Sequence, residues 1–414
     1  MLKFLHVACL LSATALASQS FAGDGGSLQI FVSKAEQSLT VYDGDQVVAT
    51  SRVSTGKPGH STPSGIFSIL EKRKYHESNL YSSAPMPWMQ RLTWSGVALH
   101  ESNSVPNYPA SHGCVRLPRA FAKALYQMTE RGAHVIITDE PVVPEPVRHA
   151  VLFQPRQPVV EGQLLSDAEL RPSTIEAGRK PVQVAMVEKD VTSPVQSSEA
   201  FADIPPVRIL ITRRGQRETV MDVQAMLTEL GFDAGIADGY LGRQTISAIN
   251  GYKRWKGLET KGEILSPEFL SRLYASAGKG EAPLGQIMVR QKFKPVFEAA
   301  ITITDPQKPL GTHFIEATHV DVLAGSAEWR GVTLENNLSN ATMKRLGIEA
   351  PTAGETTPTL AQVLDRLSIP DAVRRKIEPM LGEGSSITIS DAGIGPETGD
   401  GTDFITVTRK VPRG

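Results

Sequence analysis

The sequence contains few cysteines and few aromatic side chains, and its charges nearly cancel. Its 414 residues include two cysteines and 6% aromatic residues, and 43 basic and 44 acidic side chains give a net charge of −1. This balance gives no support for binding of nucleic acid or of another strongly anionic partner. Low aromatic content beside 35 glycines and 28 prolines favours long linkers. At about 100–200 residues per domain, the length predicts two to four domains.

No stretch after the N-terminal segment is long and apolar enough to cross a bilayer, so the mature chain is expected to lack a transmembrane segment. The N-terminal segment has Lys3, an apolar run over residues 7–16 and the small-x-small pattern Ser20-Phe21-Ala22. This pattern predicts a secretory signal peptide over residues 1–22, with a retained membrane anchor as the alternative. We therefore expect an exported protein, and the periplasm of a Gram-negative bacterium, because no wall-sorting tail or membrane anchor follows.

Removal of residues 1–22 discards Cys9 and leaves one cysteine, Cys114, in the motif Ser111-His112-Gly113-Cys114-Val115-Arg116-Leu117. A lone cysteine in an oxidising compartment forms an intermolecular bridge or is a reactive thiol. A helical pattern opens at Pro118 and closes at Gly132. We expect the N-terminus of this helix to stabilise a Cys114 thiolate.

The cysteine motif, together with Ala98-Leu99-His100 upstream, resembles the L,D-transpeptidase catalytic domain of bacterial cell-wall enzymes. Two further segments are similar to the same family: Val53-Ser54-Thr55-Gly56-Lys57 and Thr62-Pro63-Ser64-Gly65-Ile66-Phe67. Alternating apolar residues and glycine-containing turns by themselves predict a mainly-β domain with one helix over residues 27–140. The resemblance implies a β-sandwich of mixed sheets.

The resemblance also assigns roles at the site. Cys114 is expected to be the nucleophile and His100 the general base, since an imidazole with a pKa of about 6.5 can accept and return a proton. The backbone carbonyl of Glu101 is expected to orient His100, although the family usually has glycine there. The backbone N–H groups of Gly113 and Cys114 are the expected oxyanion donors.

The remaining candidates have open alternatives. His112 is expected to bond within the cysteine loop or to tune the thiol, unless it serves only the loop structure. Arg116 can hold a substrate carboxylate or form a structural ion pair. Ser111 is a candidate for substrate contact, with a turn or cap role open. Aromatic residues on strands are usually core, but three here are candidates for a substrate groove: Tyr75, Trp88 and Trp94. Six histidines lack a motif and are assigned to surface or core: His60, His76, His134, His149, His313 and His319.

The implied reaction is acyl transfer on peptidoglycan stem peptides. Cys114 would attack the carbonyl of the third residue of a stem tetrapeptide, cleave the L,D bond and release D-alanine. An amine of another stem would give a 3-3 cross-link. An amine of a protein, for example one in the outer membrane, would give attachment, and water would give carboxypeptidase or endopeptidase activity. Carbapenems should acylate the same site. No cofactor and no metal are expected.

Two other classes of function remain. His100, His112 and Cys114 could be three zinc ligands, because three protein ligands plus water form a catalytic zinc site. The chain could also be a catalytically silent wall-binding protein. A domain that has lost activity would be expected to lose Cys114 and His100, which are both retained.

Residues 141–207 contain ten prolines and no sustained periodicity, which predicts an extended Pro-rich linker, with docking of a short apolar piece such as Val151-Leu152-Phe153 on a neighbour as the alternative. Residues 208–278 then show three helical patterns. The loop between the first two resembles the small three-helix peptidoglycan-binding module: Asp238-Gly239-Tyr240-Leu241-Gly242-Arg243-Gln244-Thr245. The family ends its second helix with Phe-Gln, where this chain has Tyr252-Lys253. The resemblance implies a wall-anchoring module.

Residues 285–414 alternate strand-like segments with a helix near residues 360–367, which predicts an α+β region of unknown role. Two segments echo the catalytic region: residues 309–314 resemble residues 63–67, and residues 329–335 resemble residues 94–100. Glu335 replaces the histidine in the second echo, and no cysteine follows. The region is a candidate for a degenerate repeat of the catalytic domain, with chance similarity of short strands as the alternative.

Overall fold

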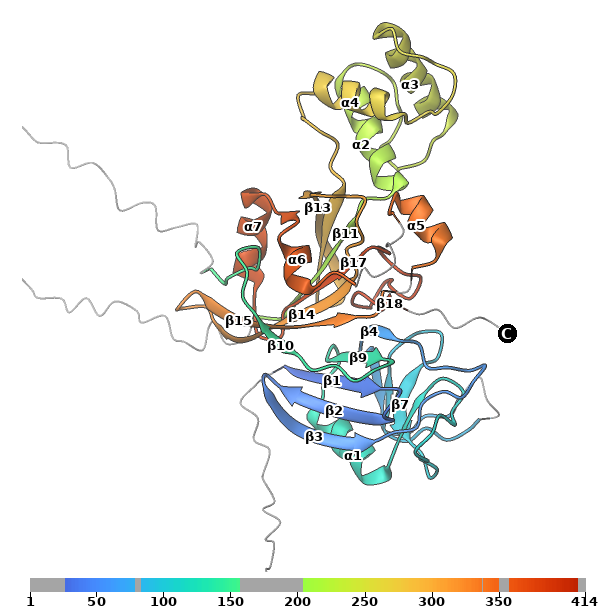
Figure 1. Ribbon diagram of the computed structural model, residues 1–414, viewed down its shortest axis with the longest axis vertical. Helices are drawn as coiled ribbons and strands as arrows, with labels where there is room; N and C mark the ends of the chain where they lie inside the picture. The colour runs from blue at the N-terminus through green and yellow to red at the C-terminus, as the bar shows by residue number, and fades with distance from the viewer. Residues whose placement is uncertain (1–26, 79–82, 157–203, 337, 350–356, 409–414) are drawn as a thin grey trace, which may run out of the picture.

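The computed structural model describes residues 27–78, 83–156, 204–336, 338–349 and 357–408 (Figure 1). A mainly-β region at the bottom of Figure 1 contacts an α+β region in the middle, and three helices project from the top. The chain is therefore multidomain with the predicted mixture of classes. The predicted signal peptide lies outside the described residues.

The first region contains a six-stranded sheet in which β1 and β9 are parallel and the other neighbours are antiparallel. A turn at Asp43-Gly44 joins β2 to β3, and Gly44 has a φ of +58°. In spatial order the strands are β18 (Thr406–Val407), β4 (Gly65–Ser68), β9 (His134–Thr138), β1 (Leu28–Ser33), β2 (Ser38–Asp43) and β3 (Gln46–Arg52).

A smaller sheet covers one face of the first and carries the site. Its strands, in order, are β5 (Glu71–Arg73), β6 (Met89–Arg91), β7 (Ala98–Glu101) and β8 (Val115–Leu117). Strands β7 and β8 are parallel, so His100 and Arg116 are register partners. Helix α1 (Arg119–Met128) follows Pro118 and buries Ala122 and Leu125 in the core between the sheets.

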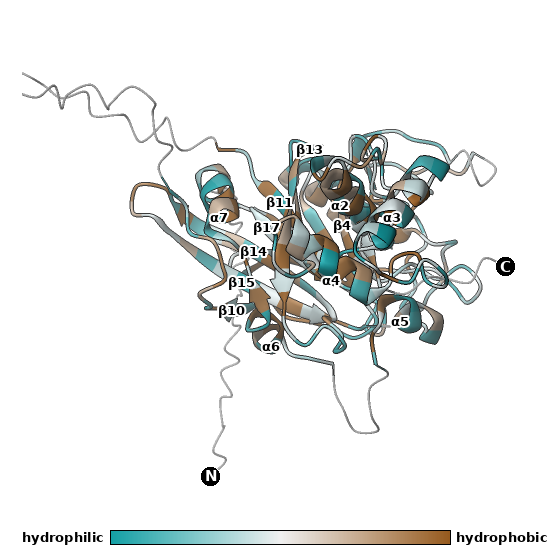
Figure 2. Cartoon of the chain, turned by 90° about the horizontal axis from the view of Figure 1, so that it is seen from above, coloured by the Kyte–Doolittle hydropathy of each residue, from teal (hydrophilic) through white to brown (hydrophobic). Residues whose placement is uncertain are grey.

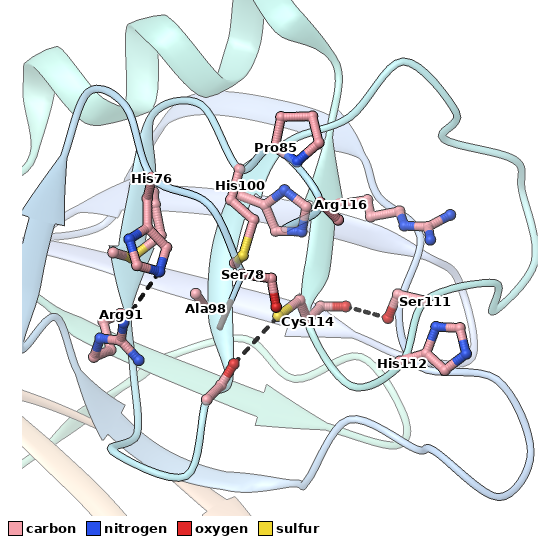
Figure 3. A pocket seen from close by; sticks show the side chains of 14 residues that line it. His76, Ser78, Pro85, Arg91, Ala98, His100, Ser111, His112, Cys114 and Arg116 are labelled. Atoms are coloured by element: carbon pink, nitrogen blue, oxygen red, sulfur yellow. Dashed lines mark hydrogen bonds between the residues drawn. The ribbon is translucent and has the colours of Figure 1, made fainter. Parts of the chain in front are cut away.

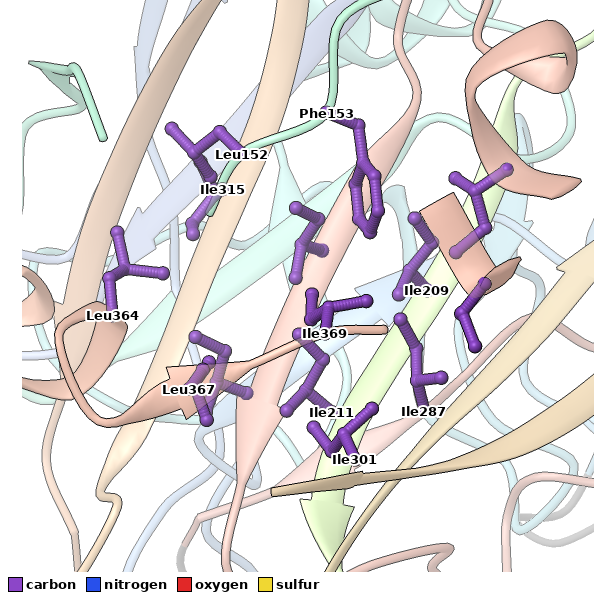
Figure 4. Close-up of a cluster of buried hydrophobic side chains, with 14 of the residues drawn as sticks. Leu152, Phe153, Ile209, Ile211, Ile287, Ile301, Ile315, Leu364, Leu367 and Ile369 are labelled. Carbon is purple, nitrogen blue, oxygen red and sulfur yellow. The ribbon is translucent and has the colours of Figure 1, made fainter. Parts of the chain in front are cut away.

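The second region is built on an eight-stranded sheet. Its core also contains side chains of α6 (Leu360–Leu364), α7 (Asp371–Ile377) and the 3-10 helix η3 (Glu378–Met380), whereas α5 (Asn340–Leu346) buries none of its residues. Its strands, in spatial order, are β10 (Glu145–Val147), β15 (Ser326–Leu334), β14 (Thr312–Asp321), β17 (Ser386–Ser390), β11 (Val207–Arg213), β12 (Gly285–Gln291), β13 (Lys294–Ile303) and β16 (Leu367–Ser368). Isoleucines and leucines of strands and helices fill its core (Figure 4).

The three projecting helices are α2 (Gln216–Glu229), α3 (Arg243–Trp255) and α4 (Pro267–Ser276), which are inserted between β11 and β12. Ser266 caps α4 by accepting from the Phe269 N–H, and Pro267 occupies the first helical turn. Figure 2 shows hydrophilic residues along α4, whereas apolar side chains of the three helices form a separate core. The predicted start of this module at residue 208 differs from the structure, since residues 207–213 are a central strand of the neighbouring sheet.

The structure corrects the first part of the predicted linker. Residues 145–147 form β10, which pairs with β15, and the Leu152 and Phe153 side chains are buried in the second core. The Trp329 indole N–H donates to the Phe153 carbonyl at 2.9 Å. Proline is compatible with this position because β10 is an edge strand. The rest of the predicted linker, residues 157–203, lies outside the described residues.

The two regions have the same strand topology. In each, three strands form an antiparallel meander, a fourth strand follows, and the last strand is parallel to the first and antiparallel to the fourth. Strands β1, β2, β3, β4 and β9 thus correspond to β11, β12, β13, β14 and β17. A helix precedes the last strand in both, α1 before β9 and α7 before β17. This agreement supports the hypothesis of a degenerate repeat.

The correspondence extends to single residues around these helices. His134 pairs with β1 as Ser386 pairs with β11, and these two residues are 252 positions apart. At the same separation, Pro118 corresponds to Pro370, and their backbones agree (φ −60° and −58°, ψ 144° and 142°). At the same separation in sequence, Arg366 corresponds to Cys114, and its guanidinium donates to carbonyl oxygens of the neighbouring loop. The second copy therefore has no thiol at this position.

The sequence echoes themselves are not the equivalent residues. Ile66 pairs with Ile136, and the residue 252 positions after Ile136 is Thr388. Thr388 pairs with Phe314, so Phe314 is the counterpart of Ile66. In this register Gly65 and Gly311, the glycines shared by the first echo, lie two residues away from alignment with each other. The second echo lies on β15, which pairs with β14, whereas the segment it resembles leads into β7 of the smaller sheet.

The two regions share a buried interface between their large sheets. Apolar side chains meet there from both sides: Phe31, Tyr42, Ile66, Ile136, Phe314, Val332 and Leu334. His134 Nδ1 lies 2.6 Å from Glu316 Oε2. Burial raises the pKa of Glu316 to about 8 and lowers the pKa of His134, so it disfavours the charged form of both partners.

The C-terminal segment returns to the first region. Strand β18 pairs with β4, and Ile405 is buried in the first region's own core. The catalytic fold predicted over residues 27–140 is therefore completed by residues about 250 positions beyond its end. No sequence pattern indicated this contact, because a two-residue edge strand carries no periodicity.

Candidate active site

A pocket opens above the smaller sheet, with Cys114 at its centre (Figure 3). His100 comes from β7 and Arg116 from β8, while His76 and Arg91 approach from the opposite side. None of the 14 lining residues is acidic. The pocket is therefore suited to a neutral or negatively charged ligand.

Cys114 lies immediately before β8, and its Sγ donates to the Gly96 carbonyl at 3.4 Å. Burial raises the pKa of the Cys114 thiol above its ordinary value, although the Ala98 amide and the charges of Arg91 and Arg116 lower it in part. The predicted stabilisation by a helix N-terminus is wrong, because β8 and Pro118 separate Cys114 from α1. The protonated thiol is thus the ground state at neutral pH.

His100 Nδ1 donates to the Glu101 carbonyl at 2.7 Å, which is the orienting contact expected from the resemblance. This contact places the proton on Nδ1 and leaves Nε2 as a proton acceptor. Burial lowers the pKa of His100 to about 4, so the imidazole is neutral at pH 7. The side chain of Glu101, which stands where the family usually has glycine, has its carboxylate 3.7 Å from the exposed Arg119. It therefore leaves the hydrogen bond between His100 and the Glu101 carbonyl intact.

The cysteine loop is held by Ser111. Its hydroxyl donates to the Cys114 carbonyl at 2.5 Å and accepts from the Gly113 N–H at 3.1 Å. Gly113 has a φ of +117°, a conformation that favours glycine. Because the Gly113 N–H is engaged inside the loop, it is not an oxyanion donor in this geometry. The Cys114 N–H remains the predicted donor.

The two upstream glycine-containing segments brace the same loop through Thr62. Its buried hydroxyl accepts from the Gly56 N–H at 2.8 Å and donates to the Gly113 carbonyl at 2.9 Å. A Cβ at Gly56 would lie 2.0 Å from the His60 carbonyl oxygen, so only glycine fits there. The sequence indicated these segments by resemblance, and in the structure they hold the cysteine loop in place through Thr62.

Thr62→Val is expected to destabilise the cysteine loop, because it leaves the Gly56 N–H and the Gly113 carbonyl without this partner. The expected loss in unfolding free energy is about 1–3 kcal/mol, measured by urea denaturation. Thr62→Ser keeps the hydroxyl and is the matched control. Equal losses in the two variants would contradict a role for the hydroxyl.

The rate of Cys114 alkylation by iodoacetamide is expected to be low at pH 7 and to rise as pH passes the raised pKa of the thiol. His100, with its pKa lowered to about 4, gains a proton only under acidic conditions and contributes no step near pH 7. Rates measured between pH 5 and 10 test this. A plateau already reached below pH 7 would instead indicate a thiolate–imidazolium pair.

The other predicted residues occupy one side of the pocket. His112 is exposed, and its ring contacts the His60 ring edge-to-face at a centroid distance of 4.7 Å. Arg116 forms no ion pair with any residue that the structure describes, so the structural alternative finds no support there. A substrate carboxylate remains the proposed partner of Arg116.

The opposite side of the pocket was missed by sequence reasoning. His76 and Ser78 follow β5, and Arg91 ends β6, in a segment without a recognisable motif. Tyr75 and Trp94, for which a core position is the usual expectation, are 85% and 53% exposed. Trp88 is partly buried against Tyr126, with ring centroids 5.4 Å apart.

A zinc site at the cysteine finds no support in the geometry. Within the described ranges, no group of three or more histidine, cysteine, aspartate or glutamate side chains is placed to hold a metal ion. His112, one of the three proposed ligands, is exposed and stacks with His60. The arrangement instead pairs one thiol with one neutral, oriented imidazole.

Two segments match known families. Residues 27–137 match the family model described as L,D-transpeptidase catalytic domain, and residues 216–273 match that of a putative peptidoglycan binding domain. No curated protein matches the chain.

Solved structures similar to the chain include an L,D-transpeptidase from Mycobacterium smegmatis, at 25% identity and a TM-score of 0.26, covering 28% of this chain and 59% of that protein. Another is an L,D-transpeptidase from Xylanimonas cellulosilytica, at 28% identity and a TM-score of 0.25, covering 27% of this chain and 60% of that protein. The chain thus spans about three fifths of the length of these relatives.

Proposed function

We propose that the protein is an exported, cysteine-dependent L,D-transpeptidase that acts on peptidoglycan stem peptides. The observation that carries the proposal is the His100 imidazole, neutral and oriented by the Glu101 carbonyl, in one pocket with the Cys114 thiol. The match of residues 27–137 to the L,D-transpeptidase catalytic domain supports the substrate class.

In the first step His100 Nε2 accepts the thiol proton as Sγ attacks the carbonyl carbon of the third residue of a tetrapeptide stem. The C–N bond to the terminal D-alanine breaks, and His100 returns the proton to the departing amine. A thioester between Cys114 and the stem remains. Since the thiol starts protonated, the base must act during attack, which suits an imidazole that is unprotonated at pH 7.

In the second step an acceptor amine attacks the thioester, and His100 takes a proton from that amine and returns one to the departing sulfur. We propose an amine of a second stem as acceptor, which gives a 3-3 cross-link. An amine of a protein and water are the alternative acceptors. No step requires a cofactor.

The three-helix module is proposed to hold the protein on the cell wall, as supported by the match of residues 216–273. It lies at the end of the molecule opposite the catalytic region (Figure 1). This placement suits attachment to wall material other than the stem in the active site. No helix within the described ranges is long and apolar enough to cross a membrane.

The test incubates the chain from residue 23 onward with a disaccharide tetrapeptide and follows free D-alanine and product masses. The proposal predicts D-alanine together with a cross-linked dimer, and neither product from Cys114→Ala. D-Alanine with tripeptide alone would indicate hydrolysis. No D-alanine from folded, reduced protein would refute the enzymatic proposal and favour the wall-binding alternative.

A further inference from the structure

We propose that Arg91, supported by His76, binds the terminal carboxylate of the donor tetrapeptide and thereby selects substrates with a free D-amino acid end. The inference rests on the proposed function and adds a specificity-determining residue to its site. The pocket brings Arg91 and His76 to the side of Cys114 opposite Ser111 and His112 (Figure 3).

The Arg91 guanidinium is held in place before any ligand arrives. Its Nε donates to Glu71 Oε2 at 3.0 Å, and the group lies 5.8 Å from the centre of the Trp94 ring. Its Nη2 lies 3.4 Å from His76 Nε2, which must accept because arginine only donates. The arginine side chain is 14% exposed, so little conformational freedom would be lost on binding.

These contacts leave donors for an anion. Arginine has five N–H donors in a planar fork, and only Nε and one position on Nη2 are used by Glu71 and His76. A carboxylate is the group that such a fork binds best, through two parallel hydrogen bonds. Glu71 occupies the Nε side of the fork from outside the pocket, and none of the described residues that line the pocket is acidic.

The position of Arg91 relative to the thiol fits the end of the donor. Arg91 and Cys114 line the same pocket, and the positive charge of Arg91 is one of the influences that lower the thiol pKa. The terminal carboxylate belongs to the residue joined to the attacked carbonyl, so it must lie close to Sγ during attack. A preorganised cation in the same pocket as the thiol can orient the donor as well as bind it.

Glu71 also supplies a matched control. Arg73 bonds to the same carboxylate, with its Nε 2.7 Å from Glu71 Oε1, but its side chain is 56% exposed and does not line the pocket. Arg73→Gln therefore removes a charge and a Glu71 contact of the same kind without changing the pocket. Arg91→Lys keeps the charge and loses the fork.

The experiment measures kcat/KM for release of the terminal residue from two donors, one ending in D-alanine and one in D-alaninamide. Wild type and Arg73→Gln are expected to favour the acid by about tenfold to hundredfold, the range for a hydrogen bond to a charged group. Arg91→Gln is expected to bring the ratio of the two kcat/KM values close to one, whatever its rate on each donor, and Arg91→Lys to keep part of the preference.

Two results would overturn the carboxylate subsite while the proposed reaction stands. One is that Arg91→Gln keeps the wild-type preference for the acid. The other is that Arg91→Gln and Arg91→Lys both lower kcat/KM equally on the two donors. Equal rates on the two donors in wild type would overturn it as well. Failure of wild type to release either terminal residue would overturn the proposed function together with the inference.

Discussion

His100→Ala is expected to lower kcat/KM for D-alanine release by about 10²–10⁴-fold, the usual contribution of a positioned general base. The thiol of Cys114 is protonated at neutral pH because burial raises its pKa, so the reaction depends on a neighbouring acceptor. His100 is that acceptor, since its Nδ1 proton is fixed on the Glu101 carbonyl and its pKa is lowered to about 4.

His112→Ala is the matched control for this prediction. His112 lines the same pocket and belongs to the same motif, but it is exposed and contacts the His60 ring. A loss below about tenfold is expected, because proximity and orientation at Cys114 are retained. A loss as large as that of His100→Ala would show that the base has been wrongly assigned.

Removal of residues 397–414 is expected to destabilise the catalytic region by several kcal/mol, although this region lies at the other end of the sequence. The deletion removes β18 and the Ile405 side chain from the first core. It also removes Glu397, whose Oε2 accepts from the Trp94 and Ser95 N–H groups at 3.1 and 3.3 Å. Those residues precede Gly96, the acceptor of the Cys114 thiol.

A single substitution measures the largest part of this effect. Ile405→Ala should lower the free energy of unfolding by about 2–5 kcal/mol, as for other large-to-small core changes. Ile394→Ala should change it by less than about 0.5 kcal/mol, because Ile394 is 49% exposed whereas Ile405 is 1% exposed. Similar unfolding midpoints for the two variants would contradict the shared core.

The sequence predicted that Cys114 and His100 belong to one site, and the structure places both in one pocket, but it indicated less about their surroundings. The motif around Cys114 and the strand ending at His100 were predicted together, and the Glu101 carbonyl has the expected contact. The prediction of a Cys114 thiolate was wrong, because a helix that follows closely in the sequence does not bring its N-terminus to the thiol. Burial, which depends on packing between two sheets, decides the pKa.

Long-range packing also explains the errors in domain organisation. Phe153 was assigned to a linker because proline-rich segments without periodicity are usually extended, yet the second core accommodates its ring. Strand β11 was assigned to the helical module because it precedes α2 in the chain. Its partners, β12 and β17, lie more than 70 and 170 residues further on.

The repeat hypothesis rested on weak sequence echoes, and the topology supports it through other residues. The strand register makes Phe314 the counterpart of Ile66, whereas Gly311 is not the counterpart of Gly65. Strands can exchange one apolar residue for another as long as their pairing register is kept. Arg366 at the position of Cys114 binds backbone carbonyls, so we propose that the second copy is a scaffold. It completes the first sheet's buried face and carries the helical module.

The central claim is that Cys114 becomes acylated, and intact mass of the protein after incubation with a carbapenem or with a disaccharide tetrapeptide tests it most directly. Wild type is expected to gain one carbapenem mass with the carbapenem, and the mass of the disaccharide tetrapeptide less that of D-alanine with the natural donor. Cys114→Ala should gain neither. An adduct of the same mass on Cys114→Ala, or none on folded and reduced wild type, would contradict the account.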